Sequence, residues 1–294
     1  MDVGSKFLWK DQIVDRNQVA IDIFDRGYNF GDGIYEVIHI YNGRLFTCRE
    51  HLERLFNSAA RIELNLGKSF EQVNELVNKL VQVNEVDHGH LYLQITRGDN
   101  DLRWHGFRFY ADQEAVFHAY TVKYPRNTVK IETPVNAITT EDLRGSMCDV
   151  KSLNLLPNVL AMHQAQKQNA QMAILVRDNI VTEEKSNNVI IVKDGILYTH
   201  PDGKHILPGI TKLVIKRICR QAGIPYIEKP VTLEELYSAD EVLTVSTNAE
   251  VVSIKSIDNQ PIGNADRGEV ARRIQELYED EIVKSCGGIF NMNG

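Results

Sequence analysis

A single lysine, Lys151, stands in a short apolar stretch of the sequence, residues 148–156, with aliphatic residues on both sides. Partial removal of water from a lysine favours its neutral amine. A neutral amine is a nucleophile that can form a Schiff base with a carbonyl compound. A lysine in such a setting is more often the ion-pair partner of a carboxylate. Lys151 therefore indicates covalent chemistry only if other suitable groups accompany it.

Two further features supply such groups. Glu183 follows a β-branched pair and could hold a proton on a pyridine nitrogen, although a lone glutamate is more often a solvated turn residue. Gly209, Ile210 and Thr211 precede a helical pattern, so their N–H groups could bind an anion. A threonine at a helix start is more often simply an N-cap. Amine, acid and phosphate-binding turn are together the parts that a pyridoxal-phosphate enzyme needs.

Two weaker motifs fit the same chemistry. Ser246 and Thr247 follow the strand-like residues 242–245, where their hydroxyls could complete a phosphate site. Arg103 and His105 lie two residues apart in a polar loop. An arginine can bind a carboxylate with two parallel hydrogen bonds, but a solvated loop is the more frequent explanation of such a pair.

Other chemistries have no comparable support. The segment 25–36 contains three glycines but lacks the strand–glycine–helix order of a dinucleotide fingerprint, and a tight surface loop explains it. The sequence has no His-Glu-x-x-His spacing, P-loop or Gly-x-Ser-x-Gly motif. No metal site is predicted.

Composition indicates a cytoplasmic protein without nucleic-acid or membrane partners. The chain has 294 residues, a net charge of −7 and 43% hydrophobic residues, and it has no basic run that would attract nucleic acid. Its apolar stretches are far shorter than the roughly 20 residues of a membrane span. The N-terminus has no apolar signal core. Four scattered cysteines without a Cys-x-x-Cys pair fit reduced thiols.

Hydrophobic periodicity predicts two domains, residues 1–122 and 131–294, joined by a linker at 123–130, where a strand-like run meets a proline. The first domain is predicted to be α+β, with the hairpin 7–14, strands 36–41, 91–96 and 116–122, and helices 52–62 and 70–80. The second is predicted to contain a helix after Pro157, a hairpin around Asp194-Gly195, a helix from Thr211 to Gly223, and a last helix around 270–278.

The chain resembles the fold-type IV pyridoxal-phosphate enzymes over nearly its whole length. This family includes branched-chain aminotransferases, D-amino acid aminotransferases and aminodeoxychorismate lyases. The stretches 25–33, 151–156 and 194–201 look most like those of the D-amino acid aminotransferases. The resemblance implies a smaller N-terminal α+β domain and a larger C-terminal β-barrel-like domain with helices.

The resemblance also implies roles for individual residues. Lys151 would bind pyridoxal 5′-phosphate covalently and move the substrate proton, and Glu183 would pair with the pyridine nitrogen. Arg144 would bond the ring hydroxyl, and Leu207 would pack near the cofactor. The residues implied to hold or lie near the phosphate are Arg54, Ile210, Thr211, Thr247, Ser246 and Ser186.

On the substrate side, Tyr35, Arg103 and His105 look like the carboxylate trap of the D-amino acid enzymes. In that family the arginine and histidine come from the neighbouring subunit, which implies a homodimer. The Arg-x-His pair favours the D-enzymes over the branched-chain group.

The sequence departs from the family pattern at three places. The small residues that follow the glutamate in the family are replaced here by Glu184, Lys185, Ser186 and Asn187, and we expect the new charges to alter the hydrogen bonds around the ring. Gly145 replaces a bulky aromatic residue, and one residue is inserted before Arg103. None of these changes removes a catalytic group.

The expected activity is reversible amino transfer between D-alanine or other D-amino acids and 2-oxo acids such as 2-oxoglutarate, giving pyruvate and D-glutamate. Two alternatives stay open: a branched-chain L-amino acid aminotransferase and an aminodeoxychorismate lyase. A non-catalytic binding protein is disfavoured because Lys151 and Glu183 are both present.

Overall fold

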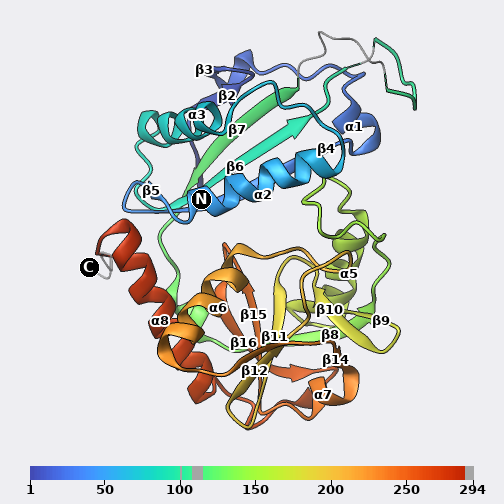
Figure 1. Cartoon of the computed structure of the whole chain (residues 1–294), viewed down its shortest axis with the longest axis vertical. Helices are drawn as coiled ribbons and strands as arrows, with labels where there is room; N and C mark the ends of the chain where they lie inside the picture. The colour runs from blue at the N-terminus through green and yellow to red at the C-terminus, as the bar shows by residue number, and fades with distance from the viewer. Residues whose placement is uncertain (100, 108–114, 289–294) are drawn as a thin grey trace. The chain divides into compact units, whose positions relative to one another are not determined.

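The computed structural model describes residues 1–99, 101–107 and 115–288 (Figure 1). Its contacts divide the chain into two compact units. The first unit contains Met1–Arg126, Val150–Asn154 and the chain from Ile282 onward, and the second contains Asn127–Asp149 and Leu155–Glu281. The contact grouping thus places Lys151 with the first unit. The domain limits predicted from the sequence stay a prediction, and residues 289–294 at their end lie outside the described residues.

The first unit contains an antiparallel sheet and two long helices. Its elements are β1 (Asp2–Val3), β2 (Lys6–Trp9), β3 (Gln12–Asp15), a 3-10 turn (Arg16–Gln18), α1 (Arg26–Phe30), β4 (Gly33–Tyr41), β5 (Arg44–Leu45), α2 (Cys48–Arg61), α3 (Phe70–Val83), β6 (Gly89–Thr96) and β7 (Val116–Lys123). The strand order is β3-β2-β7-β6-β4-β5, with β1 paired to β7. The predicted hairpin, strands and helices of this region are confirmed, with ends that differ by a few residues.

The core of this unit lies between the sheet and helices α2 and α3, which cross one face of the sheet (Figure 1). Alternate residues of β4, Ile34, Ile38 and Ile40, are fully buried there with Leu52 and Leu55 of α2. Period-two burial on the strand and helical-period burial on α2 are what the sequence pattern requires. This packing fixes which residues of β4 and α2 can meet.

The second unit contains a ten-stranded mixed sheet. Its elements are α4 (Thr128–Glu132), β8 (Val135–Glu141), α5 (Leu156–Lys167), β9 (Met172–Arg177), β10 (Ile180–Glu184), β11 (Asn188–Lys193), β12 (Ile196–Thr199), α6 (Ile210–Ala222), β13 (Tyr226–Glu228), β14 (Val231–Thr232), α7 (Leu233–Tyr237), β15 (Glu241–Ser246), β16 (Glu250–Ile257), β17 (Gln260–Pro261) and α8 (Glu269–Cys286), whose last turn belongs to the first unit. The strand order is β13-β12-β11-β15-β16-β8-β9-β10-β14, with β17 paired to β16.

Two sequence signals of this unit are confirmed. Asp194 and Gly195, with φ of 51° and 75°, form the two-residue turn between β11 and β12. Gly223 ends α6 with φ of 69°, in the left-handed region that glycine tolerates best. A register shift between Val181 and Glu184 interrupts the pairing of β10 with β9. Such irregularities redirect side chains, and this one lies at Glu183.

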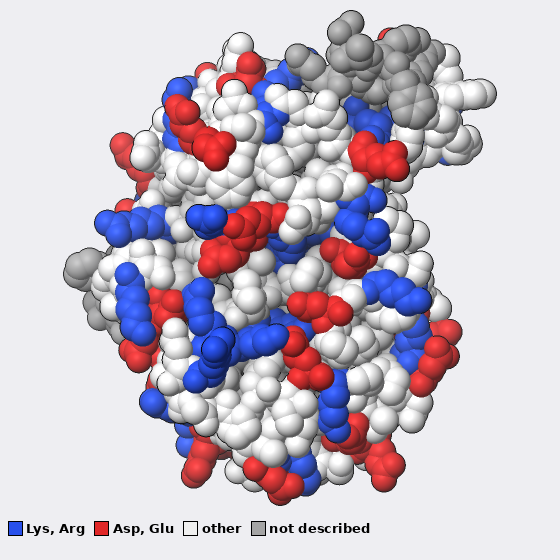
Figure 2. Space-filling view, viewed as in Figure 1, with Lys and Arg blue, Asp and Glu red and all other residues white. Residues whose placement is uncertain are grey.

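The distribution of surface charge and the polarity of the helices are relevant to the predicted partners. On the face shown in Figure 2, Lys and Arg side chains are interspersed with Asp and Glu, so the net charge of −7 is not gathered there into one patch. Among the described residues, every helix is too short or too polar to cross a membrane.

Candidate active site

The backbone of Lys151 is held against β4 in the first unit. The Tyr35 N–H donates to the Lys151 carbonyl oxygen at 3.0 Å, and the Leu153 N–H donates to the Gly33 carbonyl oxygen at 3.1 Å. Residues 151–153 therefore run alongside β4 like a short antiparallel strand. On the other side, the Lys151 N–H donates to the Ser58 hydroxyl of α2 at 3.2 Å.

The Lys151 side chain is half-buried and lies over the ring of Tyr35, with its Nζ 4.2 Å from the ring centroid. Of its aliphatic neighbours, Val150 is buried, but Leu155 and Leu156 are 37% and 69% exposed. The apolar surroundings expected from the sequence thus exist on one side only. The backbone bonds and the tyrosine ring, more than an apolar pocket, fix the position of the amine.

A buried charge network in the same unit holds Arg54. The Arg54 guanidinium donates to both oxygens of Glu36, from Nε at 2.7 Å and from Nη2 at 2.8 Å. His51, one helical turn before Arg54 on α2, places its Nδ1 2.7 Å from Glu36 Oε2. Glu36 is fully buried, so both partners are needed to offset the loss of its hydration.

The partners set the charge of this network. Burial alone would raise the pKa of Glu36, but the charge and hydrogen bonds of Arg54, helped by His51, outweigh it and lower the pKa to about 2. Burial lowers the pKa of His51 even though Glu36 acts in the opposite direction. Glu36 therefore stays ionised and keeps the Arg54 guanidinium in a fixed orientation.

Glu36 and His51 were not predicted from the sequence, although a signal for them exists. Glu36 is the only charged residue of the strand β4, and its alternate neighbours Ile34 and Ile38 face the core. A buried carboxylate needs cationic partners. His51 and Arg54, three residues apart on an amphipathic helix, share one helical face and could supply them.

In the second unit, Glu183 on β10 is buried and receives hydrogen bonds from two directions. Its Oε2 accepts from Asn188 Nδ2 and from the Leu207 backbone N–H, both at 3.1 Å. Its Oε1 forms an ion pair with Arg144. The alternative of a solvated turn residue is therefore wrong for Glu183, which is only 6% exposed. Three donors aimed at one carboxylate favour its ionised form.

Arg144 is itself fixed by Asp142. Its Nε and Nη2 donate to the two oxygens of Asp142, both at 2.9 Å. Thr182 also donates to Asp142, at 2.9 Å. Burial would raise the pKa of Asp142, but the bonds from Arg144 outweigh it and lower that pKa. Neither Asp142 nor Thr182 was predicted from the sequence. Asp142 lies two residues before Arg144, whereas Thr182 reaches this pair through the pairing of strands β8, β9 and β10.

The replaced run after Glu183 forms a separate network. Glu184 is fully buried and accepts hydrogen bonds from the Ser186 N–H at 2.9 Å and from Asn187 Nδ2 at 2.7 Å. Burial raises the pKa of Glu184, although the nearby Lys185 lowers it. The described bonds of Glu184 stay within its own turn and β9, whereas those of Glu183 go to Arg144, Asn188 and Leu207.

The N-terminus of α6 has the form of an anion site. The N-cap is Gly209, which offers no side chain to the first N–H groups, and Ile210 and Thr211 are buried within the first turn. The N-cap role considered for Thr211 is therefore wrong. A Cβ on Gly209 would lie 1.8 Å from Asn188 Oδ1, so glycine is required for this close approach. The helix start and the Glu183 network thus share Asn188.

The remaining predicted residues of this unit lie at strand or helix ends. Ser246 ends β15, and its hydroxyl accepts from the Ala249 N–H at 3.3 Å. Thr247 follows and is half-buried. Ser186 is exposed in the turn between β10 and β11, and its hydroxyl receives a bond from Lys185 at 2.8 Å. Their predicted roles near a phosphate stay predictions.

Arg103 and His105 lie on an exposed loop of the first unit, and both contact Phe30. The Arg103 guanidinium is 4.8 Å from the centroid of the Phe30 ring, and the His105 ring is 5.2 Å from it. The structure thus brings these two residues together. It also brings Lys151 to Tyr35, while Arg103 and His105 have their described contacts at Phe30 instead.

Both units therefore carry groups suited to a phosphorylated pyridine aldehyde. The first supplies an amine and an oriented guanidinium, and the second supplies a buried, hydrogen-bonded carboxylate and uncapped helix N–H groups. Within the described part of the chain, no group of three or more His, Cys, Asp or Glu side chains is arranged to hold a metal ion.

Comparison with known proteins is consistent with this chemistry. A family model described as amino-transferase class IV matches residues 33–257. The chain is 43% identical to a D-alanine aminotransferase of Listeria innocua, over 96% of this chain and 98% of the relative. It is 44% identical to a D-alanine aminotransferase of Staphylococcus aureus, over 94% and 98%. Among solved structures, a branched-chain aminotransferase from Thermoproteus uzoniensis has a TM-score of 0.85 at 26% identity, over 96% of each chain.

Proposed function

The chain belongs to the class IV aminotransferases, and we propose that within this family it transfers the amino group between D-amino acids and 2-oxo acids. The expected pair is D-alanine with 2-oxoglutarate, which gives pyruvate and D-glutamate. The similarity to D-alanine aminotransferases over almost the whole chain carries this proposal. Class IV aminotransferases use pyridoxal 5′-phosphate. When bound, this cofactor supplies an electron-withdrawing ring that stabilises the carbanion left when a Cα–H bond breaks.

Lys151 is the proposed catalytic residue. Its amine would hold the cofactor covalently and, once the substrate amine displaces it, act as general base on the Cα proton. It would then donate this proton to the cofactor, which would keep the amino group when water releases the substrate as a 2-oxo acid. The hydrogen bonds from Tyr35 and to Ser58 keep the lysine backbone still while its side chain moves.

Glu183 and Arg144 are proposed to bind the ring. An ionised Glu183 would keep a proton on the pyridine nitrogen, which strengthens the ring as an electron acceptor. Arg144, fixed by Asp142, would donate to the ring hydroxyl. Leu207 is proposed to pack beside the ring and contributes its backbone N–H to Glu183.

The phosphate is proposed to bind where positive charge and N–H groups are available. Arg54 is oriented by Glu36, and the start of α6 presents Ile210 and Thr211 without a capping side chain. The hydroxyls of Thr247, Ser246 and Ser186 are further proposed contacts or neighbours of the phosphate.

We further propose that Tyr35, Arg103 and His105 bind the substrate α-carboxylate. Arg103 and His105 would serve the site of the neighbouring subunit, so the active form would be a homodimer. Because the four cysteines carry free thiols, we expect the enzyme to work in the cytoplasm, where disulfides are rare.

One experiment separates this function from its rivals. Cofactor-loaded protein without any acceptor acid is mixed with D-alanine or L-leucine while the visible absorbance of the bound cofactor is followed. We expect D-alanine alone to convert the spectrum to that of pyridoxamine phosphate. Conversion by L-leucine alone would assign the protein to the branched-chain group. If neither amino acid changes the spectrum, the lyase reaction becomes the leading alternative.

A further inference from the structure

One buried side chain, Arg26, donates hydrogen bonds to the backbone of the loop that carries Arg103 and His105. The Arg26 Nη1 donates to the carbonyl oxygens of Trp104 at 2.7 Å and Gly106 at 3.2 Å, and its Nη2 lies 3.5 Å from the carbonyl oxygen of His105. One guanidinium thus gathers three consecutive carbonyl groups. Because these carbonyls flank His105, Arg26 fixes the backbone from which the imidazole projects.

Arg26 is held rigidly enough to act as an anchor. It is only 4% exposed, and its Nε donates to Asp32 at 2.7 Å. Its guanidinium carbon lies 5.0 Å from the centroid of the Phe30 ring and 5.1 Å from that of the Phe107 ring. An ion pair together with cation–π contacts to two rings restricts the orientation of a guanidinium.

Two side chains of the loop contact one of the aromatic rings that Arg26 contacts. Arg103 and His105 both contact the Phe30 ring, the ring on which Arg26 stacks. Phe30 ends helix α1, whose start is capped by the Asp25 carboxylate accepting from the Gly27 and Tyr28 N–H groups. The loop therefore rests on a short, well-capped helix.

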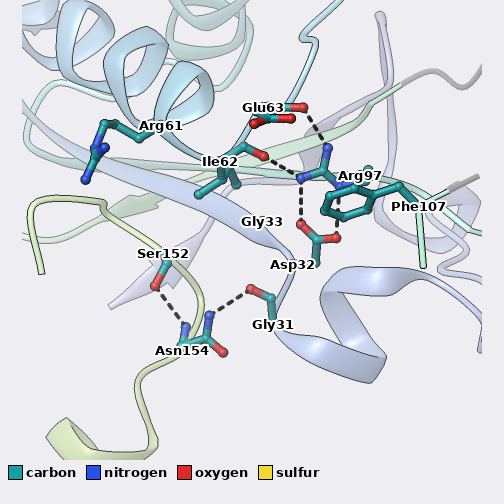
Figure 3. A pocket seen from close by; sticks show the side chains of 10 residues that line it. All are labelled: Gly31, Asp32, Gly33, Arg61, Ile62, Glu63, Arg97, Phe107, Ser152 and Asn154. Atoms are coloured by element: carbon teal, nitrogen blue, oxygen red, sulfur yellow. Dashed lines mark hydrogen bonds and ion pairs between the residues drawn. The ribbon is translucent and has the colours of Figure 1, made fainter. Parts of the chain in front are cut away.

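A second arginine, Arg97, resembles Arg26 but holds a different segment. It donates to Asp32 at 2.9 and 3.1 Å and stacks on Phe107 at 4.2 Å. Its remaining N–H groups donate to the carbonyl oxygens of Ile62 and Glu63, both at 2.8 Å, at the end of α2 (Figure 3). Arg97 has no described hydrogen bond to the carbonyls around His105, so it offers a matched control.

We propose that Arg26, supported by Asp32 and Phe30, is a positioning residue that fixes Arg103 and His105 for binding the substrate carboxylate. The inference rests on the proposed function, because it assigns Arg26 a role in carboxylate binding. Arg26 touches neither substrate nor cofactor in this role and acts only through the loop. It should therefore affect recognition of the amino acid and leave cofactor binding unchanged.

The test uses cofactor-loaded Arg26→Lys and Arg97→Lys proteins, with Arg103→Ala as reference. A lysine keeps the charge but cannot donate to Asp32 and to several carbonyl groups at once as a planar guanidinium does. We expect Arg26→Lys to raise the KM for D-alanine about tenfold or more, with the Kd for pyridoxal phosphate within about twofold of wild type. Arg97→Lys should leave the KM within about twofold of wild type.

Trp104 gives a readout of the loop that does not depend on activity. It is 59% exposed, and its indole lies against Gly106, where a Cβ would be only 2.5 Å from Nε1. Trp9 is the other tryptophan of the chain, so Trp9→Phe leaves Trp104 as the single tryptophan. In this background, Arg26→Lys should increase acrylamide quenching of Trp104 and lower its anisotropy, whereas Arg97→Lys should not.

The outcomes distinguish the inference from the function on which it rests. Unchanged Trp104 fluorescence in Arg26→Lys, or a released loop with unchanged KM, would overturn the positioning role. If wild-type protein does not convert D-alanine, the proposed function fails, and the fluorescence alone then decides whether Arg26 anchors the loop. If Arg26→Lys does not fold, Phe30→Leu replaces it, with the same expected direction for KM and quenching.

Discussion

At the scale of single residues, the buried Glu36 links stability to the proposed phosphate-binding residue Arg54. Its carboxylate holds Arg54 and His51, and its pKa is lowered from 4.5 to about 2. A carboxyl group with a lowered folded-state pKa stabilises the fold above its unfolded pKa, and this contribution is lost as the pH falls toward the folded value. The shift corresponds to about 3 kcal/mol, lost between about pH 4.5 and pH 2.

Replacing Glu36 with Gln should remove this dependence of stability on pH. At neutral pH, E36Q should lower the free energy of unfolding by about 3–5 kcal/mol, because Arg54 and His51 remain buried without their counter-charge. The difference in the free energy of unfolding between wild type and E36Q should become smaller as the pH falls from about 5 toward 3. The reason is that the wild-type carboxylate becomes protonated and its stabilising contribution is lost. Urea unfolding of the cofactor-free protein at several pH values measures this gap.

The exposed pair Arg49–Glu53 on the same helix provides the control. E53Q should change the free energy of unfolding by less than about 0.5 kcal/mol, because surface ion pairs contribute little. A gap between wild type and E36Q that stays constant or widens on acidification would contradict the assigned charge state of Glu36.

At the scale of elements, the start of α6, the end of β10 and the start of β11 depend on one glycine. A Cβ at Gly209 would lie 1.8 Å from Asn188 Oδ1. Asn188 would have to move, and its bonds to Glu183 at 3.1 Å and to the Leu207 carbonyl oxygen at 3.0 Å would be strained. The φ of Gly209 is −70°, so alanine is acceptable to the backbone and the effect is purely one of space.

Gly209→Ala should therefore weaken cofactor binding more than its small size suggests. Forcing a methyl group into a packed site costs about 1–3 kcal/mol, which corresponds to a Kd for pyridoxal phosphate raised by roughly tenfold to a hundredfold. Titration of the cofactor-free protein with pyridoxal phosphate measures this Kd. Gly288→Ala serves as control, because a Cβ there meets nothing within 4 Å. Equal affinities of the two variants would remove Gly209 from the proposed phosphate site.

At the scale of the whole molecule, the proposed homodimer predicts that two different variant chains together form one complete site, which two monomers could not do. If Arg103 serves the neighbouring subunit, a heterodimer of one K151A chain and one R103A chain has one complete site. It should show about half of the wild-type activity, as expected for one intact site of two in a twofold-symmetric dimer. The two parent proteins should each be nearly inactive or have a raised KM for D-alanine.

The two chains carry different affinity tags and are purified in succession after co-expression. An activity no higher than that of R103A alone would show that Arg103 serves its own subunit, and that the sharing of sites proposed here is wrong. A dimer of two K151A chains that carry the two different tags controls for wild-type contamination.

The sequence determined most elements of this protein by itself. Helices α2 and α3 and strands β4, β6 and β7 follow from hydrophobic period, and the turns at Asn42-Gly43 and Asp194-Gly195 follow from residues that tolerate positive φ. These signals are local, so each can be read within a few residues. The choice of Lys151 and Glu183 as chemical groups also came from the sequence, through their types and the family pattern.

Only the tertiary structure decided how those groups are held. Glu36 meets Arg54 and His51 because β4 packs on α2, and Thr182 meets Asp142 because β8, β9 and β10 are neighbours in one sheet. Arg26 lies 78 residues from Trp104 in the chain and reaches its carbonyl through folding alone. Such partners are distant in sequence, and a buried charge shows that it needs a partner without showing which one. For that reason, the chemistry could be predicted from the sequence, whereas the residues that position it could not.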